Sequence, residues 1–338
     1  MTSSALAGLA LTIVAGGMAG NCMLPAKFVR AWKWGNVWLV FSVISLVILP
    51  WSLALLLVGH LALTYSNLSM SQFAVPIAFG AGWGIAQVLF GISVTRLGLG
   101  VAYSIIVGLG AVLGTLIPLF AEQRHAVSNG TLCVLMGGVL LMVLGIALTA
   151  WGGHLREKSS ETVGASVPRS RYLTSVAIAV LCGFMAPMLN FSFAFGQDIA
   201  RQAVALGNSP ALAAYAVWPI ALAGGFVPNL LYSGFLLARD RGLSAFRSPY
   251  PDFLWSALMA VLWMGAFALY GMSATYLGTL GTSVGWGLFQ IFMITTAMLS
   301  GVLTGEWKES PVRARAYLGT GLMFLILATV LFTAGDSR

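Results

Sequence analysis

Ten long apolar runs fill most of this 338-residue chain and constrain its fold more than any other feature. A helix needs about 20 apolar residues to cross the hydrocarbon core of a bilayer. Runs of that order, bounded by charged residues, proline or polar clusters, predict an all-α integral membrane protein with ten transmembrane helices. We expect these helices at residues 5–24, 36–58, 73–94, 97–120, 130–151, 172–195, 211–238, 253–275, 277–303 and 317–334.

The composition excludes a water-soluble domain. Hydrophobic residues make up 59% of the chain and charged residues 8%, whereas a typical soluble domain has about 25% charged residues. The formal net charge of +8 therefore indicates sorting of basic residues to one membrane side rather than a nucleic-acid partner. The three histidines and three cysteines show no metal-binding spacing, so no metal and no cofactor are expected.

The distribution of Lys and Arg among the loops predicts the orientation in the membrane. Of the 17 basic residues, only Arg124, Arg201 and Arg338 lie outside the loops that follow the first, third, fifth, seventh and ninth runs. Short loops rich in Lys and Arg stay in the cytoplasm. We therefore expect both termini outside. No basic segment precedes the first run, so we expect it to be retained as a helix rather than cleaved as a signal peptide.

The chain contains an internal repeat. A shift of 180 residues aligns residues 83–98 with 263–278, and eight of the sixteen aligned positions are identical, among them Trp83 with Trp263. Pro50 matches Pro228 at nearly the same shift, and Thr149-Ala150 matches Thr333-Ala334. This pattern predicts a first five-helix repeat at 1–151, a cytoplasmic linker at 152–171 and a second five-helix repeat at 172–338.

Five helices per repeat make the second copy enter the membrane in the opposite sense, as a 5+5 inverted-topology repeat. Two such halves can exchange conformations and expose a shared midplane site to each side in turn. The repeat therefore favours a carrier that works by alternating access. A channel and a duplicated scaffold without transport are the alternatives that the repeat leaves open.

Polar side chains at membrane depth are expensive unless they face the protein interior, so they mark the candidate site. Trp83 and Gln87 lie one helical turn apart, and Trp286 and Gln290 repeat that spacing. An indole and a carboxamide on one wall suit a sugar, which has an apolar ring face and hydroxyls around it. Further candidates for the walls and for hydrogen bonding are Tyr103, Ser104, Tyr215, Trp218, Trp263, Tyr270, Asn21 and Asn190.

Each candidate has a simpler alternative. Asn and Gln side chains in a membrane often make interhelical hydrogen bonds that only hold helices together. Tryptophans near helix ends are commonly interfacial anchors or face lipid. We expect that second role for Trp32, Trp34, Trp38, Trp51, Trp151, Trp255 and Trp307.

No acidic residue is expected at the midplane, because all nine Asp and Glu fall in predicted loops or at helix ends. Proton relays through membranes normally use Asp, Glu or His chains. The sequence therefore predicts an electroneutral site for a neutral, hydroxylated substrate and offers no obvious proton carrier.

Seven short motifs occur in order along nearly the whole chain: Pro25-Ala26-Lys27-Phe28, Ile48-Leu49-Pro50-Trp51, Phe79-Gly80-Ala81-Gly82-Trp83-Gly84-Ile85, Arg96-Leu97-Gly98, Gly114-Thr115-Leu116, Ala205-Leu206-Gly207 and Gly305-Glu306-Trp307. With them the chain resembles the bacterial L-rhamnose/proton symporter family of the drug/metabolite transporter superfamily. The resemblance implies an inner-membrane location and uptake of L-rhamnose or a related monosaccharide together with a proton. It also implies a pocket built largely from the third, fourth, eighth and ninth helices.

The chain departs from the family pattern at two places. The pattern has an acidic residue before the Trp of the ninth helix and a His in the first helix, whereas this chain has Thr282 and Thr12 near those places. Proton coupling through Asp198 or Glu306 and an uncoupled sugar facilitator therefore remain open. A metabolite or drug exporter of the same superfamily is the other transport alternative. A membrane enzyme acting on lipids lacks a supporting cluster of Asp, His or Cys, so no enzymatic activity is expected.

Overall fold

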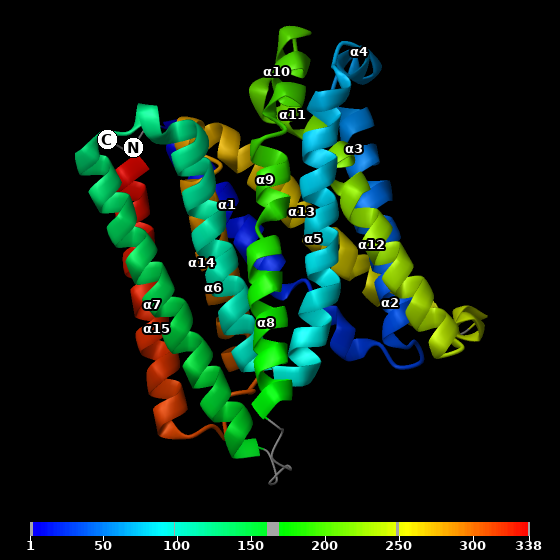
Figure 1. Ribbon diagram of the computed structural model, residues 1–338, viewed down its shortest axis with the longest axis vertical. Coiled ribbons are helices and arrows are strands. Elements are labelled where there is room, and N and C mark those ends of the chain that lie inside the picture. Colours follow the sequence, from blue (N-terminus) through cyan, green and yellow to red (C-terminus); the bar gives the residue numbers. More distant parts are fainter. Residues whose placement is uncertain (1–2, 98, 161–168, 248–249, 337–338) are drawn as a thin grey trace.

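The computed structural model describes residues 3–97, 99–160, 169–247 and 250–336. Within these ranges, ten helical segments are long and apolar enough to cross a membrane, which confirms the predicted number of transmembrane helices. They pack side by side as a single bundle (Figure 1).

The first five spans are built from α1 (Ser3–Asn21), α2 (Trp34–Val43), α3 (Leu49–Leu57), α5 (Met70–Leu97), α6 (Leu99–Pro118) and α7 (Asn129–Ser160). The last five are built from α8 (Arg169–Met185), α9 (Met188–Ala194), α12 (Val217–Arg239), α13 (Tyr250–Leu277), α14 (Val284–Leu303) and α15 (Val312–Asp336). Shorter elements connect or extend them: η1 (Leu24–Phe28), η2 (Ile44–Ile48), α4 (Leu61–Ser66), η3 (Leu119–Gln123), η4 (Arg124–Ala126), α10 (Gln197–Ala205), α11 (Pro210–Ala213), η5 (Ala214–Ala216), η6 (Gly242–Arg247) and η7 (Gly278–Leu280).

Prolines account for two interruptions that hydropathy does not reveal. Pro50 lacks a backbone N–H, and the second span accommodates it through the π-helical turn η2, which separates α2 from α3. Pro187 stands between α8 and α9, so the predicted sixth helix is broken rather than continuous. The sixth span then continues into α10 at one end of the bundle.

The helix α7 is longer than predicted. It ends at Ser160, whereas the sequence places its end at Trp151, so residues 152–160 of the predicted linker are helical. Residues 161–168 of that linker, and Gly98, lie outside the described residues. Leu, Arg, Glu and Lys after the apolar run favour continuation of the helix, because they have high helix propensity whether or not lipid surrounds them.

The packing between helices follows a matched pattern. The contact of α5 with α12 matches that of α13 with α2. The contact of α1 with α13 matches that of α8 and α9 with α5. Likewise α1 contacts α14 while α8 contacts α6, and α6 contacts α7 while α14 contacts α15. Each of these contacts thus has a counterpart among the helices that the predicted repeat aligns with them.

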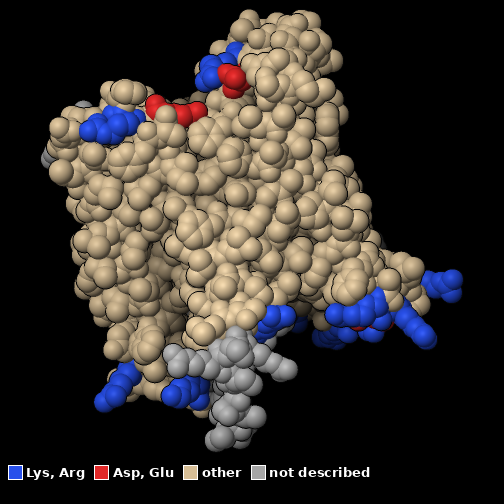
Figure 2. Space-filling view, in the orientation of Figure 1, with Lys and Arg blue, Asp and Glu red and all other residues tan. Residues whose placement is uncertain are grey.

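The two ends of the bundle differ in charge. Both termini lie at one end, here called the terminal end, and the loops that carry Lys33, Arg239 and Arg241 lie at the opposite end, here called the basic end (Figure 1). On the face seen in Figure 2, most Lys and Arg side chains gather at the basic end. The middle of that face shows no charged side chain, as expected for a surface in contact with lipid.

Candidate functional site

Two tryptophans stack at the centre of the bundle. Trp83 lies halfway along α5 and Trp263 halfway along α13, and both helices have 28 residues. Their ring centroids are 5.3 Å apart, and their planes differ by 24°. Trp83 is 5% exposed and Trp263 is 9% exposed. These two residues, which the internal repeat aligns with each other, therefore touch at mid-height of the bundle.

Other rings extend this pair toward both ends. On the basic side, Trp263 contacts Phe41, which stacks on Trp38. On the terminal side, Trp263 contacts Phe267, which contacts Phe289. Further rings complete this aromatic column, which is made of Trp38, Phe41, Trp83, Trp263, Phe267, Phe289, Tyr270, Trp286, Phe193 and Trp218.

Asn190 joins three helices through its carboxamide. Its Nδ2 donates to the carbonyls of Gly114 and Thr282, both at 2.9 Å, and its Oδ1 accepts a hydrogen bond of 2.5 Å from the hydroxyl of Tyr270. Asn190 is 1% exposed and Tyr270 is 0% exposed. Both predicted site residues are therefore engaged in a buried interhelical network, in agreement with the simpler of the two roles predicted for Asn.

The two predicted Trp and Gln pairs differ in their polar contacts. Trp286 is buried, and its indole N–H donates to the carbonyl of Gly110 at 3.1 Å. Gln290 is 6% exposed and Gln87 is half-buried. Within the described part of the chain, neither carboxamide has a hydrogen-bond partner. These amides thus retain both donor and acceptor capacity for a ligand.

The remaining candidates are scattered over the bundle. Trp218 is buried, and its indole N–H has no partner. Asn21 donates to the carbonyl of Gly17 at 2.8 Å, while its Oδ1 has no partner. Tyr103 and Ser104 are half-buried on α6, and the hydroxyl of Tyr215 points at the sulfur of Met272.

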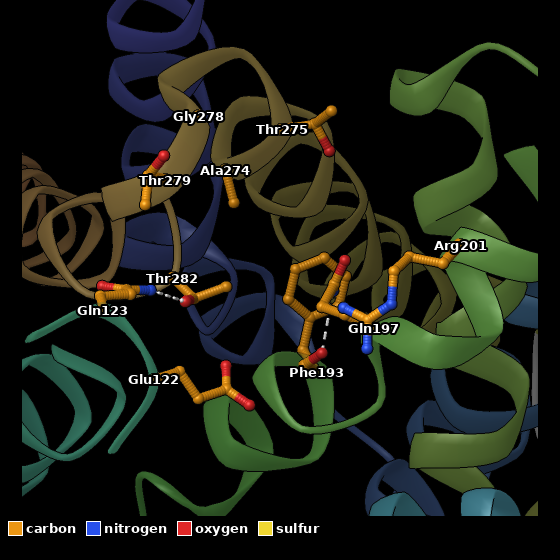
Figure 3. A pocket seen from close by; sticks show the side chains of 10 residues that line it. All are labelled: Glu122, Gln123, Phe193, Gln197, Arg201, Ala274, Thr275, Gly278, Thr279 and Thr282. Carbon is orange, nitrogen blue, oxygen red and sulfur yellow. Dashed lines mark hydrogen bonds between the residues drawn. The ribbon is translucent and has the colours of Figure 1, made fainter. Parts of the chain in front are cut away.

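A pocket of about 540 Å³ opens at the terminal end, and sequence reasoning missed it. Figure 3 shows its walls, which come from η3, α9, α10, α13, η7 and the turn before α14. None of the twelve candidate site residues predicted from the sequence lines it. Its lining residues are Glu122, Gln123, Phe193, Gln197, Arg201, Ala274, Thr275, Gly278, Thr279 and Thr282.

The pocket adjoins the aromatic column. Phe193 lines the pocket, and its ring stacks on that of Trp218 with centroids 4.7 Å apart. Thr282 also lines the pocket, and its carbonyl accepts the hydrogen bond from Asn190. Below this floor the column fills the centre of the bundle with buried rings. A molecule in the pocket would therefore be separated from the basic end by packed side chains.

The pocket walls are polar and carry two charges. Gln123 donates to the hydroxyl of Thr282 at 2.6 Å, and Gln197 donates to the carbonyl of Phe193 at 2.9 Å. Glu122 and Arg201 point into the cavity from opposite sides (Figure 3). The guanidinium of Arg201 pairs with Asp198, three residues earlier on α10. The sequence does not single out these groups, because charged and polar side chains are ordinary at helix ends.

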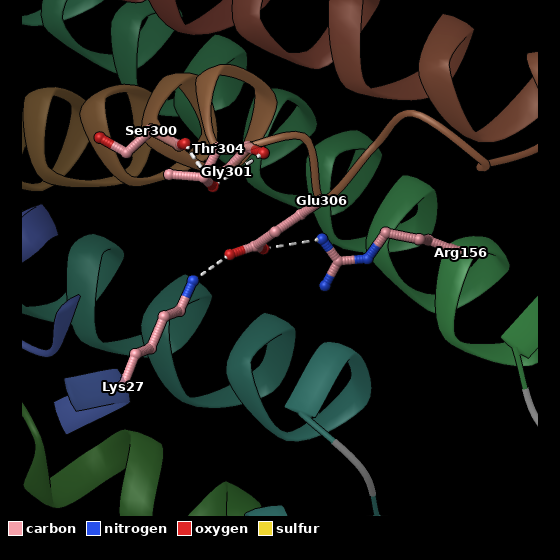
Figure 4. A network of polar contacts seen from close by, with 6 residues as sticks. All are labelled: Lys27, Arg156, Ser300, Gly301, Thr304 and Glu306. Atoms are coloured by element: carbon pink, nitrogen blue, oxygen red, sulfur yellow. Dashed lines mark hydrogen bonds and ion pairs between the residues drawn. The ribbon is translucent and has the colours of Figure 1, made fainter. Parts of the chain in front are cut away.

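A charge network joins three segments at the basic end. Glu306, in the connection between α14 and α15, pairs with Lys27 of η1 and with Arg156 of α7, the latter at 3.2 Å (Figure 4). The hydrogen bond from Lys27 holds the pKa of the Glu306 carboxyl below its usual range. The network thereby ties η1, α7 and the connection between α14 and α15 together.

A second carboxylate also ties connections at the basic end. Asp252, at the start of α13, is 4% exposed. It accepts hydrogen bonds from the backbone N–H groups of Arg30, Ala31 and Trp32 at 3.1, 2.7 and 2.8 Å. The connection between α1 and α2 is therefore fixed against α13.

Two tryptophans predicted as interfacial or facing lipid are buried in protein instead. Trp38 is 6% exposed, and its indole N–H donates to Oδ1 of Asn229 at 2.9 Å. Trp307 is 4% exposed and lies under the guanidinium of Arg156, 4.9 Å from the ring centroid. The prediction was wrong because nearness to a helix end does not determine which face of the helix a side chain occupies.

The two positions that depart from the family pattern carry hydrogen-bonded hydroxyls. Thr12 lies 2.5 Å from the hydroxyl of Ser273 and donates to the carbonyl of Gly8. Thr282 accepts from Gln123, as described above. Among the described residues, no group of three or more His, Cys, Asp or Glu side chains could hold a metal ion.

Ten apolar helices, a buried aromatic column and a polar pocket at one end define a multi-pass α-helical membrane protein. The family model described as L-rhamnose-proton symport protein (RhaT) matches residues 1–337, so the chain belongs to this family and the predicted resemblance is confirmed. Relatives named L-rhamnose-proton symporter include proteins of Yersinia pestis (strain Pestoides F), 26% identical over 344 residues, and of Escherichia coli O17:K52:H18 (strain UMN026 / ExPEC), 25% identical over 346 residues. Each alignment covers 99% of this chain and 99% of the relative.

Proposed function

We propose that the protein is a secondary active carrier, not an enzyme, that imports L-rhamnose or a related monosaccharide together with a proton by alternating access. The observation that carries this proposal is the match of the symporter family model to residues 1–337. Full-length relatives named L-rhamnose-proton symporter support the same substrates. The neutral polar groups near the centre of the bundle suit a hydroxylated, uncharged molecule.

We infer that the carrier consists of two inverted five-helix repeats, at 1–151 and 172–338, joined by a linker at 152–171. The matched packing of corresponding helices supports this inference. So does the contact between Trp83 and Trp263 at mid-height, because residues near a two-fold pseudosymmetry axis meet their own counterparts. The alternating-access mechanism follows from such a pair, since the two halves can exchange their conformations.

We infer that the terminal end faces the periplasm and the basic end faces the cytoplasm of a bacterial inner membrane, following the positive-inside rule. With that orientation, the described conformation is outward-facing. The pocket opens toward the periplasm, while the ion network around Glu306 and the capped loop at Asp252 close the cytoplasmic side.

The substrate site, in this proposal, lies at the aromatic column beneath the pocket. Gln87 and Gln290 supply hydrogen bonds to sugar hydroxyls, and the indoles of Trp83, Trp263 and Trp286 supply flat apolar walls. Asn190 and Tyr270 position the surrounding helices through their mutual hydrogen bond. Asn21, Tyr103, Ser104 and Trp218 remain candidates for the rest of the wall.

Uptake of radiolabelled L-rhamnose into proteoliposomes tests the proposal. With an acidic exterior, we expect saturable accumulation that a protonophore abolishes. Saturable uptake without accumulation would instead establish an uncoupled facilitator. That alternative arises because Thr12 and Thr282 stand where the family pattern has a His and an acidic residue. No saturable uptake of any monosaccharide, together with counterflow of another metabolite, would overturn the sugar assignment in favour of an exporter.

The candidate amides can be tested in the same vesicles. Gln87→Ala and Gln290→Ala should each raise the half-saturating L-rhamnose concentration by about tenfold, the loss expected for one or two hydrogen bonds to a ligand. Gln202→Ala, on α10 and outside the pocket lining, is the matched control and should behave like the parent. Unchanged half-saturation in both site variants would exclude these amides as ligand contacts.

A further inference from the structure

Two glutamates follow corresponding helices of the two halves but have different partners. Glu306 follows α14 and is paired with Lys27 and Arg156 at the basic end. Glu122 follows α6 and lines the open pocket at the terminal end. Within the described part of the chain, no ion pair or hydrogen bond engages the Glu122 carboxylate.

The sequence aligns these two glutamates. A shift of 184 residues, the shift that matches Thr149-Ala150 with Thr333-Ala334, places Glu122 on Glu306. The same shift matches Leu119 with Leu303 and Arg124 with Lys308. A Leu-x-x-Glu-x-basic segment therefore follows both helices.

The cationic partners also occupy comparable places. Lys27 lies in η1, the short helix that follows the first span, and Arg201 lies in α10, the short helix that extends the sixth span. Arg201 points into the pocket from the side opposite Glu122 (Figure 3), but its guanidinium is held by Asp198. The terminal end thus contains the components of the network that closes the basic end, in an unassembled arrangement.

We propose that Glu122 and Arg201 form an ion pair that closes the periplasmic side of the pocket during transport, as Lys27 and Glu306 close the cytoplasmic side in the conformation described here. The proposal rests on the proposed alternating-access function. Closure brings the pocket walls together and removes both side chains from water, and a buried charge is tolerated in a membrane protein when it is paired. Arg201 would then exchange Asp198 for Glu122, or contact both.

Charge reversal combined with two independent readouts tests this pair. Each variant is made in a Cys133→Ser background with Thr275→Cys as a reporter in the pocket wall, because Cys22 and Cys182 are buried whereas Cys133 is exposed. Counterflow of radiolabelled L-rhamnose measures transport, and labelling by a membrane-impermeant maleimide measures how open the pocket is. Thermal unfolding in detergent confirms that each variant is folded.

Glu122→Arg and Arg201→Glu should each slow counterflow at least about tenfold and increase labelling of the reporter, because like charges then face each other across the pocket. The double variant should recover counterflow to within about threefold of the parent, since opposite charges are restored. Asp198→Asn should decrease labelling, because it releases Arg201 toward Glu122. Glu309→Arg, on an exposed loop at the basic end, is the control and should leave both readouts unchanged.

Folded single variants with normal counterflow and labelling would overturn the proposal. So would a double variant that is no better than the worse single variant. If the parent transports no L-rhamnose at all, the proposed substrate fails while the labelling shifts still decide the ion pair, so the two failures are distinguishable.

Discussion

Asn190 illustrates how one buried amide can hold several helices at fixed distances. Its three hydrogen bonds reach α6, α13 and the turn before α14. Asn190→Ala leaves two carbonyls and the fully buried Tyr270 hydroxyl without this partner. We expect a loss of about 2–3 kcal/mol in the free energy of unfolding, because unsatisfied buried polar groups keep their desolvation cost. Thermal unfolding in detergent measures it.

Two control variants distinguish the loss of these hydrogen bonds from general effects of substitution. Tyr270→Phe removes one of the three hydrogen bonds and keeps the ring contacts, so it should cost less than Asn190→Ala. Asn67→Ala changes an exposed side chain at the end of α4 and should leave the unfolding temperature unchanged. Equal unfolding temperatures for Asn190→Ala and the parent would contradict the structural role given to Asn190.

At the scale of single residues, the sequence identified which polar side chains lie inside the bundle better than it identified their hydrogen-bond partners. The rarity of amides and indoles in apolar runs was enough to single out Asn190, Gln87, Trp83 and Trp286. Their partners could not be predicted, since the carbonyl of Gly114 and the hydroxyl of Tyr270 come close to Asn190 only through packing of distant helices. The charged pocket residues were missed for the opposite reason, because Glu122 and Arg201 stand at helix ends, where charge is ordinary.

The contact between α5 and α12 depends on the absence of side chains. A Cβ on Gly84 would lie 2.6 Å from the carbonyl oxygen of Gly225, whereas a Cβ on Gly234 of α12 would meet nothing within 4 Å. We expect Gly84→Ala to push the helices apart and to cost about 1–3 kcal/mol. Gly234→Ala should be neutral or stabilising by up to about 1 kcal/mol through helix propensity. Chemical denaturation in detergent distinguishes them, and equal stability of the two variants would refute this account of the helix contact.

The ion pairs of Glu306 at the basic end should make the free energy of unfolding decrease at low pH. Because the pKa of Glu306 is lowered by Lys27, its ionised form stabilises the folded state at pH values above the ordinary carboxyl range. That contribution is lost as the pH falls through the lowered pKa. Between pH 7 and about pH 3, the unfolding temperature of Glu306→Gln should therefore decrease less steeply than that of the parent. Glu309→Gln should follow the parent, and a parallel fall in all three proteins would rule out a contribution from this network.

The helices themselves were predictable to within a few residues at most ends, because the apolar runs are set by the thickness of the membrane. Breaks inside a span could not be predicted from the apolar runs, as the interruption at Pro187 shows. An X-Pro step allows a kinked or a broken helix, and packing around α9 decides between them. The extension of α7 beyond the membrane likewise depends on local helix propensity, which hydropathy does not report.

For the whole molecule, the sequence predicts the number of spans and the family but not the location of the pocket. The ten spans and the family were predicted from the sequence and are confirmed. The repeat anticipated neither which end would be open nor where a pocket would form. In the proposed inverted repeat, two halves of similar sequence can adopt either of two arrangements of nearly equal energy, so the residue pattern alone does not determine at which end a pocket opens.

Orientation in the membrane is the remaining prediction at this scale, and it decides whether the described conformation faces outward. Single cysteines at Ser209 and Ser244 in a Cys133→Ser background report the two ends, since both serines are exposed and lie in connections at opposite ends of the bundle. In intact cells, an impermeant maleimide should label Ser209→Cys, and should label Ser244→Cys only after the membrane is permeabilised. The reverse pattern would place the open pocket toward the cytoplasm, and the loops rich in Lys and Arg would then violate the positive-inside rule.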